Sequence, residues 1–222
     1  MKLLTLDTST EACSCALLVE GEIKERTVMA VRQHAELILP MIDELLTEAG
    51  LKPTQLDALA VGRGPGSFTG VRIACGVAQG ISFALDIPII PLSSLATLAQ
   101  AAYIELGTHR VLATIDARMN EIYYGYYILN PEGIMQIVGS EAVIAPEKIE
   151  RPTGDPWYGV GSGWTSYHES LQTRLDTDLQ GYQVDRYPQA RAMIPLAQVT
   201  YSKREYVSAE QLIPVYLRNR VV

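Results

Sequence analysis

A glycine-dense segment constrains the fold of this chain more than any other part of the sequence. Residues 59–80 run from an apolar stretch through glycines at positions 62, 64, 66 and 70 into a helical pattern. Glycine accepts backbone angles that a side chain forbids, so several amides can converge on one anion near a helix start. Such glycines are also typical of a backbone that passes close to another backbone or to a partner. Because the segment matches neither a P-loop nor a dinucleotide-binding turn, nucleotide contact and a structural or docking role both stay open.

Composition limits the partners of the chain. Its 222 residues include 18 Lys and Arg against 25 Asp and Glu, a formal net charge of −7. Binding to a polyphosphate needs clustered positive charge, so we expect any nucleic-acid contact to depend on a partner protein. Cys13, Cys15 and Cys75 lie in apolar contexts and are predicted to be small buried hydrophobes, without a disulfide framework. With no signal-peptide core and no apolar run near the ~20 residues of a membrane span, we expect a cytoplasmic protein with no membrane contact.

The first half of the chain is predicted to alternate strands and helices. The expected strands cover residues 2–6, 12–19, 23–29, 56–61 and 87–91, and the expected helices 33–49, 71–85 and 92–102. The first three strands form a meander. Pro40 predicts a bend or a missing hydrogen bond in its helix, and Gly76 and Gly80, one turn apart, predict a flat helix face that another helix can approach.

The second half repeats the order of the first. Strands are expected over residues 111–115, 121–129 and 134–138, a glycine-rich run follows at 157–163, and a final helix at 194–205. Asp116 ends its strand as Asp7 ends the first one. A duplicated lobe with acidic tips and glycine loops predicts an α/β fold of the actin-like, sugar kinase and Hsp70 ATPase architecture. We assign residues 1–102, joined by 191–222, to the first lobe and 103–190 to a second, reduced and poorly helical lobe.

Four separated motifs carry a resemblance to a known family. They are Asp-Thr-Ser-Thr-Glu-Ala-Cys-Ser at 7–14, Gly-Arg-Gly-Pro-Gly-Ser-Phe-Thr-Gly-Val-Arg at 62–72, Asp-Ala-Arg-Met-Asn-Glu-Ile-Tyr at 116–123 and Pro-Val-Tyr-Leu-Arg at 214–218. In this order, and across nearly the whole chain, they resemble the TsaB family of bacterial tRNA threonylcarbamoyladenosine biosynthesis proteins.

The resemblance implies a subunit without a reaction of its own. The family's catalytic relative, TsaD, shares the fold and transfers a threonylcarbamoyl group to the adenosine beside the tRNA anticodon, with a metal held by a His-x-x-x-His pair. Here Ser94 and Leu98 stand at the corresponding positions, and neither replaces an imidazole ligand. His34, His109 and His168 have no paired spacing, so we expect solvent-facing or hydrogen-bonding roles for them.

The implied role is that of a scaffold and activator. The partners are a TsaD-type catalytic paralogue, a TsaE-type ATPase and, through the complex, tRNA; alone, the chain is expected to form a homodimer. It requires no cofactor of its own, and ATP or ADP with magnesium is expected to bind only weakly, at the complex interface.

Two groups of site residues follow. The first is a partner interface on the exposed parts of the 33–49 and 71–85 helices, which suit a four-helix seam and a homodimer that excludes the partner. Its residues are Leu37, Met41, Leu45, Ile73, Gly76, Val77 and Gly80. The second group lines the cleft between the lobes. Its residues are Asp7, Thr8, Arg63, Gly64, Gly66, Ser67, Thr69 and Asp116. For Asp7 alone, capping of its own turn is the simpler interpretation.

Two enzymatic alternatives stay open. One is an active actin-like ATPase or small-molecule kinase with Asp7 and Asp116 around magnesium nucleotide. The short second lobe argues against it, because residues 140–189 offer little chain for adenine-holding helices. The other is a stand-alone metallopeptidase, weakened by the absence of a His-Glu-x-x-His motif.

Overall fold

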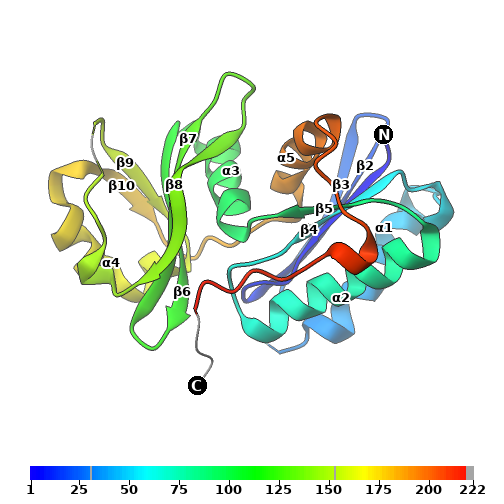
Figure 1. Cartoon of the computed structure of the whole chain (residues 1–222), viewed down its shortest axis with the longest axis horizontal. Coiled ribbons are helices and arrows are strands. Elements are labelled where there is room, and N and C mark those ends of the chain that lie inside the picture. The colour runs from blue at the N-terminus through cyan, green and yellow to red at the C-terminus, as the bar shows by residue number, and fades with distance from the viewer. Residues whose placement is uncertain (31, 153, 219–222) are drawn as a thin grey trace.

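The protein consists of two lobes, each built on a five-stranded mixed sheet (Figure 1). The computed structural model describes residues 1–30, 32–152 and 154–218. The four terminal residues of the predicted 191–222 segment therefore lie outside the described part.

The first sheet lies in the N-terminal half. Its strands are β1 (Leu3–Asp7), β2 (Ala12–Val19), β3 (Glu22–Met29), β4 (Ala58–Gly62) and β5 (Ile89–Leu92), in the order β3-β2-β1-β4-β5. The first three strands pair antiparallel, which confirms the predicted meander, and β1, β4 and β5 run parallel. Helices α1 (His34–Glu48) and α2 (Phe68–Leu85) cover one face, and α5 (Ala190–Ser202) covers the other.

The central strand β1 explains why both faces carry helices. All five of its residues are buried. Leu4 and Leu6 join the cluster beneath α1 and α2, while Leu3 joins the cluster beneath α5. Successive side chains of a strand point to opposite faces, so an apolar strand of this kind needs cover on both.

The second sheet repeats the first. Its strands are β6 (Arg110–Arg118), β7 (Glu121–Leu129), β8 (Met135–Ile144), β9 (Trp157–Val160) and β10 (Leu179–Gln183), in the order β10-β9-β6-β7-β8. Helix α4 (Ser162–Leu175) follows the second glycine run as α2 follows the first. Between β8 and β9, where the first lobe has α1, the described residues include the short 3-10 turn Pro146–Lys148 and no α-helix. Among the described residues, the second lobe therefore has no helix equivalent to α1.

Two helices cross between the lobes. Helix α3 (Ser94–Leu106) follows β5 of the first sheet but packs against the second, and α5 follows β10 but packs against the first. The chain after α5 returns along the first lobe, where Val207 bridges to Ile89 and the Val215 amide donates to the Arg63 carbonyl at 2.8 Å. Its last described residue, Arg218, reaches the second lobe and pairs with Glu121 of β7. The helix expected at 92–102 was assigned to the first lobe, whereas its apolar residues complete the core of the second.

Several element boundaries differ from the expectations. Strand β8 continues to Ile144, well past the expected end at 138, and α4 and β10 were not predicted. Helix α4 is interrupted at Tyr167, which has φ −136°. Helix α1 is continuous through Pro40; a proline has no N–H, so the predicted loss of one hydrogen bond follows from its chemistry.

Candidate functional site

The glycine loop fits closely against the loop that follows β1. A Cβ on Gly66 would lie 2.3 Å from the Ser9 carbonyl oxygen, and one on Gly70 would lie 2.0 Å from the Thr8 carbonyl oxygen. The Ser67 amide donates to the Ser9 carbonyl at 2.7 Å, and the Thr8 hydroxyl donates to the Gly70 carbonyl at 2.7 Å. Two backbones can approach this closely only without side chains between them. These glycines therefore serve the structural role, and Gly70 lies inside the first turn of α2.

Asp7 is enclosed by this arrangement. Its side chain is 1% exposed, and its Oδ1 accepts from the Ser9 amide at 2.7 Å and the Ser9 hydroxyl at 2.6 Å. Its Oδ2 accepts from the Ser94 hydroxyl at 3.1 Å, and a Cβ on Gly62 would collide with the same oxygen. Burial raises the pKa of this carboxyl above its ordinary value, against the lowering by hydrogen bonds from Ser9. The Asp7 carboxyl group thus lies inside a buried hydrogen-bond network with Ser9 and Ser94.

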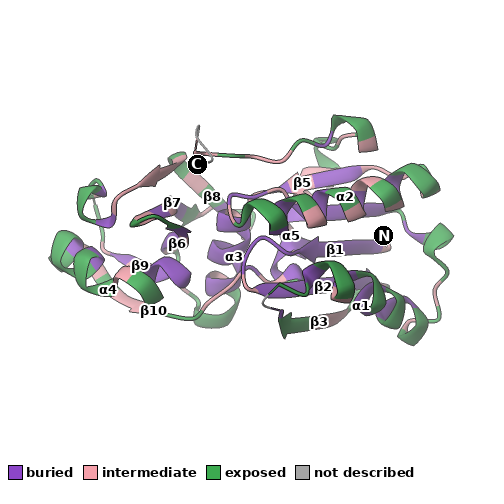
Figure 2. Ribbon diagram, turned by 90° about the horizontal axis from the view of Figure 1, so that it is seen from below, coloured by how far each residue is buried: buried purple, intermediate pink, exposed green. Residues whose placement is uncertain are grey.

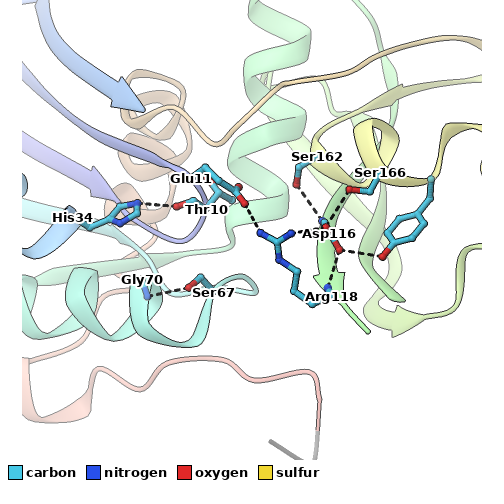
Figure 3. Close-up of polar contacts among 10 residues, drawn as sticks. Thr10, Glu11, His34, Ser67, Gly70, Asp116, Arg118, Ser162 and Ser166 are labelled. Atoms are coloured by element: carbon cyan, nitrogen blue, oxygen red, sulfur yellow. Dashed lines mark hydrogen bonds and ion pairs between the residues drawn. The ribbon is translucent and has the colours of Figure 1, made fainter. Parts of the chain in front are cut away.

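Asp116 occupies the equivalent position in the second lobe and is more accessible. It accepts from the Arg118 amide at 2.8 Å and from the hydroxyls of Ser166 and Tyr167 at 3.1 and 3.4 Å. The Arg118 guanidinium pairs with Asp116 at 3.1 Å and with Glu11 of the first lobe at 2.8 Å. Figure 3 shows this bridge across the space between the lobes. Glu11 and Arg118 were missed in the sequence, although both lie inside the motifs quoted above.

The remaining predicted cleft residues differ in accessibility. Thr8 and Gly64 are buried, Arg63 and Gly66 are half-buried, and Ser67 and Thr69 are exposed at the start of α2. Ser67 caps that helix, since its side chain accepts from the Gly70 amide at 3.4 Å. Asp7 and Thr8, which were expected to line the cleft, are both buried, and their side chains form internal hydrogen bonds.

The two positions that correspond to the metal-binding histidines of the catalytic relative hold residues with structural roles. Ser94 is buried and donates to Asp7, and Leu98 is 1% exposed in the core between α3 and the second sheet. The ring of His34 is buried and its Nε2 lies 2.8 Å from the Thr10 carbonyl oxygen, which is the hydrogen-bonding role expected for it. Within the described residues, no three His, Cys, Asp or Glu side chains cluster closely enough to hold a metal ion.

The outer face of α1 and α2 is the second candidate site. The two helices pack side by side on the first sheet, and both face the viewer in Figure 2. A Cβ on Gly76 or Gly80 would have nothing within 4 Å, and Ile73 and Val77 beside them are half-buried. Further large apolar side chains on this side are Phe83, 76% exposed, and Leu39, 52% exposed. An exposed apolar strip of this kind is typical of a protein-protein contact.

Two of the predicted interface residues do not belong to this face. Met41 is 6% exposed and Leu45 is 0% exposed, and both lie in the core cluster between α1 and the sheet. Leu37 is half-buried. The apolar stripe of α1 is wide because it covers the sheet, so its inner part is unavailable to a partner. Phe83 and Leu39, which were not among the predicted interface residues, supply exposed apolar surface instead.

Two sheets of the same strand order, with Asp7 at the end of β1 and Asp116 near the end of β6, define an α/β protein of the actin-like architecture. Comparison with known proteins narrows this class. The family described as "TsaD: tRNA N6-adenosine threonylcarbamoyltransferase" matches residues 27–218. Two relatives, from Haemophilus influenzae and Escherichia coli, are named tRNA threonylcarbamoyladenosine biosynthesis protein TsaB. They are 44% and 41% identical to this chain. The alignments include 100% of this chain and 95% and 96% of the two relatives.

A solved structure agrees with these relatives. YeaZ from Pseudomonas aeruginosa has 48% sequence identity and a TM-score of 0.91, with 97% of this chain and 99% of that chain covered. The chain belongs to the TsaB family.

Proposed function

We propose that this protein is a non-catalytic subunit that binds and activates a TsaD-type paralogue in threonylcarbamoyl transfer to the adenosine next to the tRNA anticodon. Its TsaB relatives are named for tRNA threonylcarbamoyladenosine biosynthesis. The observation that carries the proposal is the outer face of α2, where Gly76 and Gly80 are open and Phe83 is 76% exposed.

The interior of the chain supports a role without chemistry. Catalysis on a phosphoryl or acyl group needs charged groups that reach the reacting atoms. Asp7 is instead buried among hydroxyl and amide donors, and the metal-ligand positions hold Ser94 and Leu98. The same observations disfavour the ATPase and metallopeptidase alternatives.

The interface follows from the shape of α2. A helix with glycines four residues apart and no nearby Cβ allows a second helix to approach its backbone. Helix α1 lies beside α2, so a pair of like helices from a partner would complete a four-helix seam. Such docking activates the paralogue if it binds the competent state more tightly than the resting one.

A membrane is the competing occupant of this apolar face. Helix α2 is the one described helix with the length and composition of a membrane span. However, its residues Val71, Ala74, Cys75 and Ala78 are in the core cluster beneath the helix. Removing the helix from the sheet would expose that core, so we propose a protein partner and a cytoplasmic location.

The same face serves self-association in this proposal. An isologous homodimer through α1 and α2 covers the surface that the paralogue needs, so the two complexes exclude each other. A TsaE-type ATPase and tRNA then join only the mixed complex.

Gly76→Leu tests the interface. The leucine projects from the open face, so the variant is expected to fold normally and to lose the paralogue in pull-down and light-scattering experiments. Thr173→Leu, on the exposed surface of α4 in the second lobe, is the matched control and should bind like the unaltered chain. Undiminished binding by Gly76→Leu, or binding of the chain to lipid vesicles at this face, would contradict the placement.

A further inference from the structure

The outer face of α2 carries one charged residue, Arg72. The sequence of the helix, residues 68–85, contains no other Asp, Glu, Lys or Arg. Arg72 lies four residues before Gly76 and eight before Gly80, and is therefore on the same face of the helix. It is exposed, as are both glycines.

The side chain of Arg72 is held in place by its neighbours. Its guanidinium carbon lies 3.7 Å from the centre of the Phe68 ring and 5.7 Å from the centre of the Tyr216 ring. Its Nε donates to the Tyr216 hydroxyl at 2.8 Å. The two rings contact each other, with centroids 5.5 Å apart. Stacking and one hydrogen bond thus fix the direction of the guanidinium group.

The terminal nitrogens of Arg72 have no hydrogen-bond or ion-pair partner within the described residues, 1–218 without 31 and 153. An arginine with a fixed plane and free terminal N–H groups matches a carboxylate, which accepts two parallel hydrogen bonds. If a partner covers this face, the guanidinium loses water and must be paired, because an unpaired buried charge is strongly unfavourable.

We propose that Arg72 is the specificity-determining residue of the α2 face and binds a carboxylate side chain of the TsaD-type paralogue, with Phe68 and Tyr216 as its positioning residues. This inference rests on the proposed function. It assigns to the C-terminal segment a role in recognition, since the tail is attached to α2 by the Gln79 amide, which donates to the carbonyls of Ala209 and Leu212 at 3.1 and 3.2 Å.

The experiment measures binding of the purified paralogue to a series of variants at several salt concentrations. Arg72→Ala is expected to weaken binding tenfold or more and to flatten the salt dependence, because it removes a charged pair. Arg72→Lys should not restore affinity, since lysine has no planar fork. Tyr216→Phe keeps the ring but loses the hydroxyl, and should weaken binding by a smaller factor. Arg191→Ala, an exposed arginine that pairs with Glu25 on the other side of the lobe, is the control.

The outcomes separate this inference from the proposed function. If the unaltered chain does not bind the paralogue at all, both fail. Suppose that the unaltered chain binds the paralogue and Gly76→Leu does not. If Arg72→Ala then binds with unchanged affinity and salt dependence, only the role of Arg72 is overturned. The role is also overturned if Arg72→Ala disrupts self-association alone, which would make a second copy the source of the carboxylate. Thermal unfolding of each variant shows whether lost binding reflects lost folding.

Discussion

Two glycines of the same helix should respond in opposite ways to the same substitution. Gly70→Ala places a Cβ 2.0 Å from the Thr8 carbonyl oxygen, whereas Gly76→Ala places one in open space. An ordinary van der Waals contact of a Cβ exceeds 3.4 Å, so at position 70 one backbone must move by more than an ångström. Overpacking of this kind costs about 1–3 kcal/mol, and occasionally more.

The Thr8 hydrogen bond adds to the loss. Its hydroxyl donates to the Gly70 carbonyl at 2.7 Å, and displacing the loop removes about 1 kcal/mol. Gly70→Ala should therefore lower the free energy of unfolding by about 2–4 kcal/mol. Gly76→Ala should raise it by about 0.5–1 kcal/mol, because alanine favours a helix over glycine.

Urea unfolding of the two variants and the unaltered chain measures the difference in free energy, and thermal unfolding measures the corresponding difference in Tm. For a chain of this size, 1 kcal/mol shifts Tm by about 2–4 °C, so the two variants should be separated by roughly 5–20 °C. Equal stability of Gly70→Ala and the unaltered chain would refute the argument that the glycine loop exists for close backbone contact.

Three further predictions concern single groups. Burial raises the pKa of Asp7, so the folded state holds this proton more tightly, and the stability of the protein falls as pH rises from the ordinary aspartate pKa toward the raised one. Asp7→Asn should remove this component of the pH dependence from unfolding free energies measured between pH 4 and 8. An unchanged slope of the unfolding free energy against pH would contradict the assignment. Burial raises the pKa values of the Cys13, Cys15 and Cys75 thiols to about 11, 12 and 11, so a disulfide reagent at pH 8 should modify these cysteines only after the protein unfolds. Fast reaction of the native chain would contradict this prediction. Arg118→Ala should lower stability by less than about 1 kcal/mol, because its side chain is 71% exposed, as a denaturation curve can check against the unaltered chain.

The elements with strong periodicity could be predicted from the sequence. The meander, α1 and α2 combine apolar runs with clear glycine breaks, and each was found near its expected place. Helix α4 begins with Ser-Gly and has few apolar residues, and β10 is a short strand with one leucine, so neither presents a periodic signal. Their structure depends on packing against the second sheet, which local sequence does not contain.

The site was predictable in outline and not in detail. The equivalence of Asp7 and Asp116 in the two lobes followed from the internal repeat. However, the buried network around Asp7 includes Ser94, which is 87 positions away in the chain. The stripe of α1 shows which residues are apolar but not which of them meet the sheet, so Met41 and Leu45 were placed on the wrong side. The orientation of the Arg72 side chain depends on its hydrogen bond to Tyr216, a residue that comes next to α2 only when the C-terminal segment folds back onto that helix.

The most direct measurement of the central claim is threonylcarbamoyl transfer to unmodified tRNA by the purified paralogue and its ATPase, with and without this protein. We expect transfer only when the chain is added, a stable mixed complex in light scattering, and no turnover by the chain alone. Transfer that proceeds equally in its absence, with no mixed complex, would contradict the scaffold role and favour the ATPase alternative.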